Sequence, residues 1–303
     1  MPGDNSVDRA QTLGELRNLT GREPEVSPFL APASQKPAVA AISQSKNPQI
    51  AELAVPQTHP SELVDHEKFL YPRWPWRKPV AWLRNTFLEI VAQPLVWFLA
   101  NPRVVDRPDL HPTEPMLIVC NHVTAYDGPL VQFALPGRVR RRIAVAMAGE
   151  MLEDYRHFRN PEHAPGQRRF MLFGPAAYYL VTALFNVFPL PRHRDVQRSF
   201  AHAGEALDLG YNVLVFPEGT RSAAGELARF RPGIGMLVKQ SQAAVLPVAI
   251  RGLGELKSQG RGWFRSGKIE VRVGEPLRFA VIESETAITE RLAAEVRRLL
   301  LES

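Results

Sequence analysis

Four short apolar runs constrain the fold of this chain more than any other feature. They cover 116–120, 143–147, 212–216 and 244–250. Runs of this length between turn-forming residues are typical of buried strands. Segments with helical character lie between them, so strands and helices alternate along the chain. Such alternation predicts an α/β fold in which a mostly parallel central sheet is flanked by helices.

The segments between and after these runs predict the remaining elements. Residues 188–192 resemble a strand that runs into a turn, and 244–250 resemble a strand that is broken by Pro247. Residues 268–273 alternate charged and apolar side chains, which predicts an edge strand. Polar residues and two prolines make 153–169 an expected surface loop. Helices are expected up to Leu135, over 176–185, over 195–209 with Gly210 as its cap, around Lys239, and over 285–301.

A polar motif follows the first apolar run. Asn121 and His122 come at the carboxyl end of the expected strand, where open α/β sheets place their ligands. Asp127 lies five residues after His122, and a histidine held by a carboxylate can act as a general base. Thr124 and Asp127 also have the spacing of a capping box that begins a helix. From spacing alone, a catalytic pair and a helix-capping Asp beside a structural His both remain open.

Residues 1–66 are expected to be a disordered N-terminal extension. They contain eight prolines and one phenylalanine, but no tryptophan or tyrosine. Such a segment cannot bury enough apolar surface to offset its chain entropy. Short helices around 13–19 or 50–54 are compatible with this composition.

Residues 67–105 form a second region that is rich in tryptophan and arginine. Four of the five tryptophans lie here within 24 residues, and 85–102 is mostly apolar. Tryptophan and basic residues that flank an apolar stretch are typical of a membrane interface. Glu89 and Pro94 argue against an intact span, which needs about 20 apolar residues. We therefore expect a kinked helix or helical hairpin lying in one leaflet. The alternative is a helix packed on the protein's own core.

Two later stretches also bear on membrane contact. Residues 170–191 carry no charge over 22 positions, but Gly174-Pro175 interrupts them, which predicts a buried or membrane-touching helix. Four arginines lie close together at Arg138, Arg140, Arg141 and Arg142. Such a run is usually a solvated face, although it can contact lipid head groups.

Charge and cysteine content narrow the function classes. Residues 67–303 carry 32 Lys and Arg against 23 Asp and Glu, which suits phosphates, acidic cofactors or an anionic membrane surface. No nucleic-acid-binding signature accompanies this charge, so no nucleic-acid partner is expected. The single cysteine, Cys120, excludes an internal disulfide and is compatible with a cytosol-facing location. His157 and His163 lack a further ligand cluster, so no metal site is expected. The first 25 residues lack the apolar core of a signal peptide.

Four motifs together resemble the glycerolipid acyltransferase family, of the 1-acyl-sn-glycerol-3-phosphate acyltransferase (lysophosphatidate acyltransferase) type. The resemblance extends over about 80–280 and rests mainly on the first and third motifs. The motifs are Asn121-His122 with Asp127, Pro191-Arg192, Phe216-Pro-Glu-Gly-Thr-Arg221, and Leu246-Pro-Val-Ala-Ile250. The family implies a glycerol-3-phosphate acyltransferase-like catalytic domain, here over 106–303.

The resemblance also implies a role for each matching residue. His122 would take the proton from an acceptor hydroxyl as it attacks an acyl thioester, and Asp127 would orient His122. No covalent acyl-enzyme, metal or cofactor is implied, in agreement with the absence of a serine-elbow motif. Pro217 and Pro247 would shape the site. The residues expected to bind substrate are Asn121, Arg192, Glu218, Gly219, Thr220 and Arg221. Two alternatives remain: Glu218 pairs only with Arg221, and Arg192 is a surface residue.

The sequence departs from the family pattern at positions that bear on the acceptor. The family commonly has a lysine two residues before a glutamate after the second strand, where this chain has Ala148 and Glu150. We expect 1-acyl-glycerol-3-phosphate as the acceptor, with another lysophospholipid or lipid alcohol as the alternative. Acyl-CoA and acyl carrier protein both remain open as donors. The expected location is the cytoplasmic face of a membrane, with monotopic attachment. A thioesterase or other hydrolase and a non-catalytic membrane-binding protein are the rival classes.

Overall fold

The described part of the chain belongs to one compact unit that covers Glu67–Ser303. The predicted disorder of 1–66, with its short helices, lies outside the described residues, as do His163, Arg192 and most of the predicted loop. The computed structural model describes residues 69–105, 108, 110, 114–157, 174–191, 196–222, 226–258 and 268–302.

A seven-stranded sheet forms the centre of this unit, in the order β1-β7-β6-β2-β5-β3-β4. Every neighbouring pair is parallel except β6 and β7. This arrangement confirms the α/β fold with a mostly parallel central sheet. The strands are β1 (Arg103–Val105), β2 (Met116–Cys120), β3 (Ile143–Met147), β4 (Val187–Pro189), β5 (Asn212–Val215), β6 (Ala244–Arg251) and β7 (Glu270–Val273).

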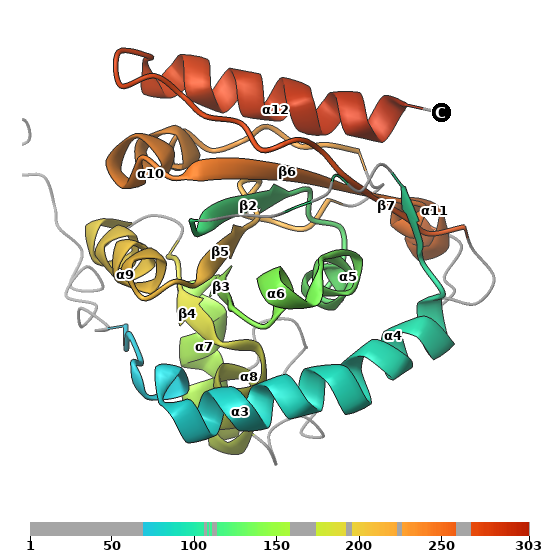
Figure 1. The fold of residues 1–303 in the computed structure, drawn as a ribbon, viewed down its shortest axis with the longest axis vertical. Helices are drawn as coiled ribbons and strands as arrows, with labels where there is room; N and C mark the ends of the chain where they lie inside the picture. The colour runs from blue at the N-terminus through green and yellow to red at the C-terminus, as the bar shows by residue number, and fades with distance from the viewer. Residues whose placement is uncertain are drawn as a thin grey trace, which may run out of the picture. The chain divides into compact units, whose positions relative to one another are not determined.

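Helices cover both faces of the sheet (Figure 1). One face packs against α5 (Asp127–Ala134), α6 (Gly137–Arg140), α7 (Gly149–Arg156), α8 (Gly174–Phe185) and α11 (Leu253–Ser258). The other face packs against α9 (Val196–Asp208), α10 (Gly233–Ser241) and α12 (Glu285–Leu301). Side chains of β2 alternate between the two layers: Ile118 packs in the first and Leu117 in the second. A strand buried on both faces explains the uninterrupted apolar run in the sequence.

The prediction that 268–273 forms an edge strand is wrong. β7 lies inside the sheet, because β1 pairs with its outer side through Arg103 to Val105. The alternation in the sequence has another cause, since Arg272 is buried beside Glu270 and Glu302 at ion-pair distances of 3.7 and 3.9 Å. A buried charged side chain that has ion-pair partners looks like an exposed one in the sequence.

The prediction that Pro247 breaks its strand is also wrong, because β6 runs through it without interruption. The Pro247 carbonyl accepts a 2.9 Å hydrogen bond from the Gly274 amide, one residue beyond the end of β7. The nitrogen of Pro247 therefore faces a position where the β6–β7 ladder already ends. The lost N–H costs little there.

The apolar stretch of the N-terminal region forms one bent helix, and not a hairpin. It consists of α3 (Lys78–Phe87), a π-helical segment (Leu88–Ala92) and α4 (Gln93–Ala100), preceded by a short 3₁₀ turn (Trp74–Trp76). The π segment ends at Ala92, two residues before Pro94. A proline lacks the amide hydrogen and crowds the carbonyl of the preceding turn, and a local widening of the helix relieves both problems. No helix in the described residues is both long and apolar enough to cross a membrane.

One face of this helix packs on the domain. Arg84, Leu88, Ala92 and Ala100 are buried and lie at spacings of four and eight residues. The Arg84 guanidinium donates to the Pro75 carbonyl at 3.0 Å. The expected alternative of a helix packed on the protein's own core therefore holds for this face.

Ion pairs hold the middle of the same helix. Glu89 accepts hydrogen bonds from Arg140 at 2.7 Å and from Arg141 at 3.1 Å. Arg140 and Arg141 therefore bind the N-terminal helix to the domain, and the arginine run is not simply a solvated face.

The predicted loop over 153–169 begins too early, because Glu153 to Arg156 form the last turns of α7. Glu153 is buried and bonds Arg156 at 2.6 Å and His157 at 3.1 Å. Pairs at spacings of three and four residues stabilise a helix, so this polar stretch is helical although its composition predicted a loop.

Candidate active site

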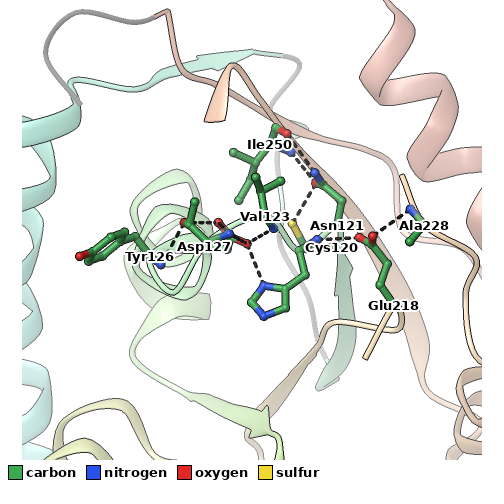
Figure 2. Close-up of polar contacts among 10 residues, drawn as sticks. Cys120, Asn121, Val123, Tyr126, Asp127, Glu218, Ala228 and Ile250 are labelled. Atoms are coloured by element: carbon green, nitrogen blue, oxygen red, sulfur yellow. Dashed lines mark hydrogen bonds and ion pairs between the residues drawn. The ribbon is translucent and has the colours of Figure 1, made fainter. Parts of the chain in front are cut away.

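The first and third motifs meet at one edge of the sheet. β2 and β5 are parallel neighbours, with Val119 opposite Val215. Because both strands point the same way, the residues that follow them lie side by side at their carboxyl ends. Figure 2 shows the polar contacts that join the two motifs.

Asp127 is completely buried and saturated with hydrogen bonds. Its carboxylate accepts from the Val123 amide at 2.6 Å, the Thr124 amide at 3.0 Å and the Thr124 hydroxyl at 2.8 Å. The predicted capping box is therefore only half formed. The carboxylate bonds the Thr124 amide, but the threonine oxygen accepts from the Tyr126 amide at 3.1 Å, and α5 begins later, at Asp127.

The His122 ring is held from two directions. Its Nδ1 lies 2.8 Å from Asp127 Oδ2, and the side chains of His122 and Asp127 are 23% and 0% exposed. Phe216 stacks on the imidazole with ring centroids 4.5 Å apart and an interplanar angle of 27°. With Nδ1 directed at the carboxylate, Nε2 is the nitrogen available to a substrate. This geometry suits a general base whose tautomer is fixed by the buried acid.

The main chain of His122 is also bound to the third motif. The His122 amide donates to Glu218 Oε1 at 2.7 Å, and the His122 carbonyl accepts from the Ser222 amide at 2.8 Å. The turn that carries His122 is therefore attached to the segment after β5 at two points.

Glu218 is 4% exposed, and both of its carboxylate oxygens accept main-chain amides. Its Oε2 accepts from the Ala228 amide at 2.9 Å. Burial raises the pKa of the Glu218 carboxyl above its ordinary value, while the bonds from the Ala228 and His122 amides partly oppose the shift. The alternative that Glu218 pairs only with Arg221 is wrong, because these amides are its partners.

The rest of the third motif forms the turn around Gly219. Gly219 has φ +70°, and a Cβ on it would lie 2.3 Å from the Arg231 Nε. Only glycine fits this close approach without strain. Thr220 is exposed and Arg221 is half-buried, so both side chains reach the surface. Pro217 is buried, and its carbonyl accepts from the Arg231 amide at 2.9 Å.

Asn121 is placed differently from the expectation that it binds substrate. Its side chain is buried, its Nδ2 donates to the Ile250 carbonyl at 3.0 Å, and its Oδ1 accepts from the Ile250 amide at 2.8 Å. Asn121 thus ties the end of β2 to the end of the fourth motif. Pro247 lies further back in β6, opposite Val119, where it shapes the sheet.

The second motif follows β4, which lies two strands beyond β5 in the sheet. Pro191 is buried after β4, which pairs with β3, and β3 pairs with β5. Arg192 itself is outside the described residues. The structure therefore brings together residues of the first, third and fourth motifs.

Sequence reasoning missed three groups at this site. Phe216 was listed as a strand end and as part of the third motif but was given no role, and the roles of the Thr124 hydroxyl and the Ser222 amide were not foreseen. An aromatic residue directly before the Pro-Glu-Gly turn was an available signal for Phe216. The Cys120 thiol is fully buried, and burial raises its pKa well above the ordinary value, which disfavours the reactive thiolate.

This chain is similar to known acyltransferases. Residues 101–251 match the family model Acyltransferase. The chain is 24% identical to a 1-acyl-sn-glycerol-3-phosphate acyltransferase of Cocos nucifera, over 59% of this chain and 50% of the relative. It is 27% identical to the human 1-acyl-sn-glycerol-3-phosphate acyltransferase beta, over 57% of this chain and 55% of the relative. The chain thus matches about half the length of these two relatives.

A solved structure shares the fold. The crystal structure of the 1-acyl-sn-glycerophosphate (LPA) acyltransferase PlsC from Thermotoga maritima superposes with a TM-score of 0.50 and 23% identity, covering 76% of this chain and 82% of that one. This likeness concerns the fold. About half of this chain, residues 101–251, belongs to the acyltransferase family, as its match to the family model shows.

Proposed function

We propose that this protein is an O-acyltransferase that moves a fatty acyl chain from an acyl thioester to the hydroxyl group of a lysophospholipid. The observation that carries the proposal is the 2.8 Å contact between His122 Nδ1 and the fully buried Asp127, at the carboxyl edge of a parallel sheet. The curated relatives are named as 1-acyl-sn-glycerol-3-phosphate acyltransferases, which supports 1-acyl-glycerol-3-phosphate as the acceptor.

His122 acts as the general base in the proposed reaction. Nε2 removes the proton from the acceptor hydroxyl as its oxygen attacks the thioester carbonyl carbon. The tetrahedral intermediate then expels the thiolate. The imidazolium of His122 gives this leaving group the proton that it took from the acceptor. A new ester bond forms and the thioester bond breaks, with no acyl-enzyme intermediate. Asp127 holds Nδ1–H and stabilises the imidazolium. Proton transfer by a positioned base such as His122 typically raises the rate about 10²- to 10⁴-fold.

The acceptor phosphate is assigned to Arg221, which lies after the turn that follows β5. A guanidinium can bind a phosphate through two parallel hydrogen bonds. Ala148 stands where the resembling family commonly has a lysine, so this position adds no cation to the acceptor site. A different lysophospholipid or lipid alcohol is therefore the second candidate acceptor. Acyl-CoA and acyl carrier protein are both retained as donors.

A panel of acceptors tests this proposal. The protein is incubated with a labelled acyl-CoA or acyl carrier protein thioester and, separately, with lysophosphatidate, neutral lysophospholipids or lipid alcohols. Labelled phosphatidate formed only with lysophosphatidate supports the first acceptor, and a product from another acceptor replaces it. Release of labelled fatty acid at the same rate without any acceptor identifies a thioesterase and refutes acyl transfer. No product of either kind would identify a non-catalytic protein.

We further propose monotopic attachment to a membrane, on the cytoplasmic face, through the exposed face of the N-terminal helix. This face lies opposite the buried one and includes Trp82 at 69% exposure, Ile90 at 69% and Trp97 at 58%. Contiguous exposed apolar side chains of this size mark an interaction surface. The face is hereafter called the apolar helix face, and its members are Trp82, Leu83, Ile90, Val91, Leu95, Trp97 and Phe98.

The chemistry of the proposed substrates favours a bilayer as the partner of this face. A lysolipid acceptor resides in a membrane, and an enzyme that uses it must reach the lipid surface. Arg77 and Lys78 lie exposed at the start of the helix, where they can contact anionic head groups. Tyr179 and Leu180 are exposed on α8, which packs against α3, and they form a second exposed apolar pair.

A further inference from the structure

The carboxylate of Glu218 joins three segments that are distant in the sequence. It extends from the turn after β5, accepts the His122 amide at 2.7 Å from the turn after β2, and accepts the Ala228 amide at 2.9 Å from the segment before α10. Figure 2 shows Glu218 between Asn121 and Ala228.

Other main-chain bonds run parallel to this bridge. The Ser222 amide donates to the His122 carbonyl at 2.8 Å, and the Arg231 amide donates to the Pro217 carbonyl at 2.9 Å. The glutamate is the one side chain among these contacts that bonds the base-bearing turn and the 226–231 segment at once. Its position therefore determines how these two segments lie relative to each other.

Burial and bonding leave little of Glu218 for a substrate. The residue is 4% exposed, and each oxygen already accepts a main-chain amide. A group that bound the acceptor would need an exposed oxygen or a free donor. Two acceptor oxygens are what an ionised carboxylate offers, and Glu218 uses both of them.

We propose that Glu218 is a positioning residue of the acyl transfer reaction, which fixes the main chain of His122 against the 226–231 segment and does not contact the acceptor. This inference rests on the proposed function, because it assigns Glu218 a part in aiming the base. It differs from the expectation from family resemblance, in which Glu218 shapes the acceptor site. It follows that Glu218 affects kcat through His122 and leaves the affinity for the acceptor nearly unchanged.

The test compares Glu218→Gln with Glu226→Gln in the full chain. The glutamine amide can accept only one of the two N–H groups and directs an NH₂ group at the other. Glu226 is exposed on the same segment and serves as the matched control. We expect Glu218→Gln to lower kcat about 10- to 100-fold, the scale of a lost hydrogen bond to a charged group. The acceptor KM should change less than about 3-fold, and Glu226→Gln should match the wild type.

Two results would overturn the inference: an acceptor KM that rises while kcat is kept, or a Glu218→Gln variant with wild-type kcat and KM. Hydrogen exchange of the wild-type protein provides a second measurement that requires neither a folded variant nor turnover. The His122 and Ala228 amides should both be protected in the absence of substrate. Rapid exchange of either amide would show that the bridge is not formed, even in a protein without acyltransferase activity.

Discussion

At the scale of single residues, the site separates buried side chains that hold the structure from side chains that reach the surface. Asp127, Glu218 and Asn121 are buried, and each is bonded to the main chain of a neighbouring segment. Thr220 and Arg221 reach the surface, and His122 lies between the two groups. Substitutions at the two kinds of position should therefore differ in their effects on stability and on kinetics.

Replacement of Arg221 by lysine tests the phosphate assignment. An ammonium group cannot reproduce the two parallel bonds of a guanidinium, so the acceptor KM should rise about 10-fold, corresponding to about 1.4 kcal/mol. The donor KM should stay unchanged in steady-state kinetics, and Arg297→Lys on the exposed side of α12 should have no effect. A change in the donor KM alone would move Arg221 to the thioester side of the site.

The turn at Gly219 provides a stability prediction with an internal control. Gly219→Ala adds a Cβ 2.3 Å from the Arg231 Nε at a positive φ, so the free energy of unfolding should fall by at least about 1–2 kcal/mol. Gly204→Ala lies inside α9, where the new Cβ meets nothing within 4 Å, and should stabilise by about 0.5–1 kcal/mol. Urea unfolding of both variants measures the difference, and equal stabilities would contradict the close packing at Gly219.

At the scale of elements, the N-terminal helix combines the two structures that its sequence left open. One face packs on the domain through Arg84, Leu88 and the Glu89 ion pairs, and the opposite face exposes large apolar side chains. Deletion of the whole helix would thus remove core contacts as well as the proposed membrane face. Substitutions confined to the exposed face are the cleaner test.

Replacing Trp82, Ile90 and Trp97 together by glutamine should weaken binding to anionic vesicles strongly. Each buried apolar side chain contributes about 1.5–3 kcal/mol, whereas each nearby basic residue contributes about 1 kcal/mol. For the same reason, high salt should weaken binding of the wild type only in part. Vesicle co-sedimentation measures both effects.

Val281→Gln with Ile282→Gln is the matched control, because both residues are exposed and belong to the loop before α12. This control should bind vesicles like the wild type. If the triple variant also binds like the wild type at high salt, the anchor is another surface, and the exposed Tyr179 and Leu180 of α8 are the next to test.

The attachment of the N-terminal region to α9 should depend on pH. His202 is buried in α9 and stacks on Trp76 with ring centroids 4.7 Å apart. Burial lowers its pKa from 6.5 to about 4, although Glu205, 4.0 Å away, opposes the shift. The folded state thus favours the neutral ring, so this stabilisation is complete above pH 6.5 and is lost as the pH falls toward 4.

His202→Gln should therefore flatten the pH dependence of stability between pH 6.5 and 4. Thermal unfolding at several pH values measures the slope for the variant and the wild type. Gln197→Ala is the control, because Gln197 is exposed on the same helix and does not titrate. An unchanged slope in His202→Gln would assign the acid sensitivity to other groups.

At the scale of the whole molecule, the sequence predicted the helices, strands and motifs better than the order in which the strands pair in the sheet. The runs that became β2, β3, β5 and β6 are buried on both faces, so their apolar character alone revealed them. The order of strands depends on contacts between distant residues, such as Val104 with Val271, and local patterning does not encode these. The position of β7 inside the sheet was missed for this reason.

The site shows the same division. His122 and Asp127 are five residues apart, so their contact is local; spacing suggested the pair but left a capping role for Asp127 open. The amides that bind Glu218 come from His122 and Ala228, which only the folded sheet brings together. Sequence therefore suggested His122 and Asp127 as a candidate pair, whereas the contacts of Glu218 could be found only in the structure.

The central claim is that His122 is the base of an acyl transfer reaction, and His122→Ala tests it most directly. The rate of transfer from a labelled acyl thioester to the accepted lysolipid is measured for the wild type and the variant, with thermal unfolding to show that both are folded. We predict at least a ~10²-fold lower kcat for His122→Ala, the scale of general acid–base catalysis, and a similar loss for Asp127→Asn. A folded His122→Ala variant that transfers the acyl chain at close to the wild-type rate would contradict the account.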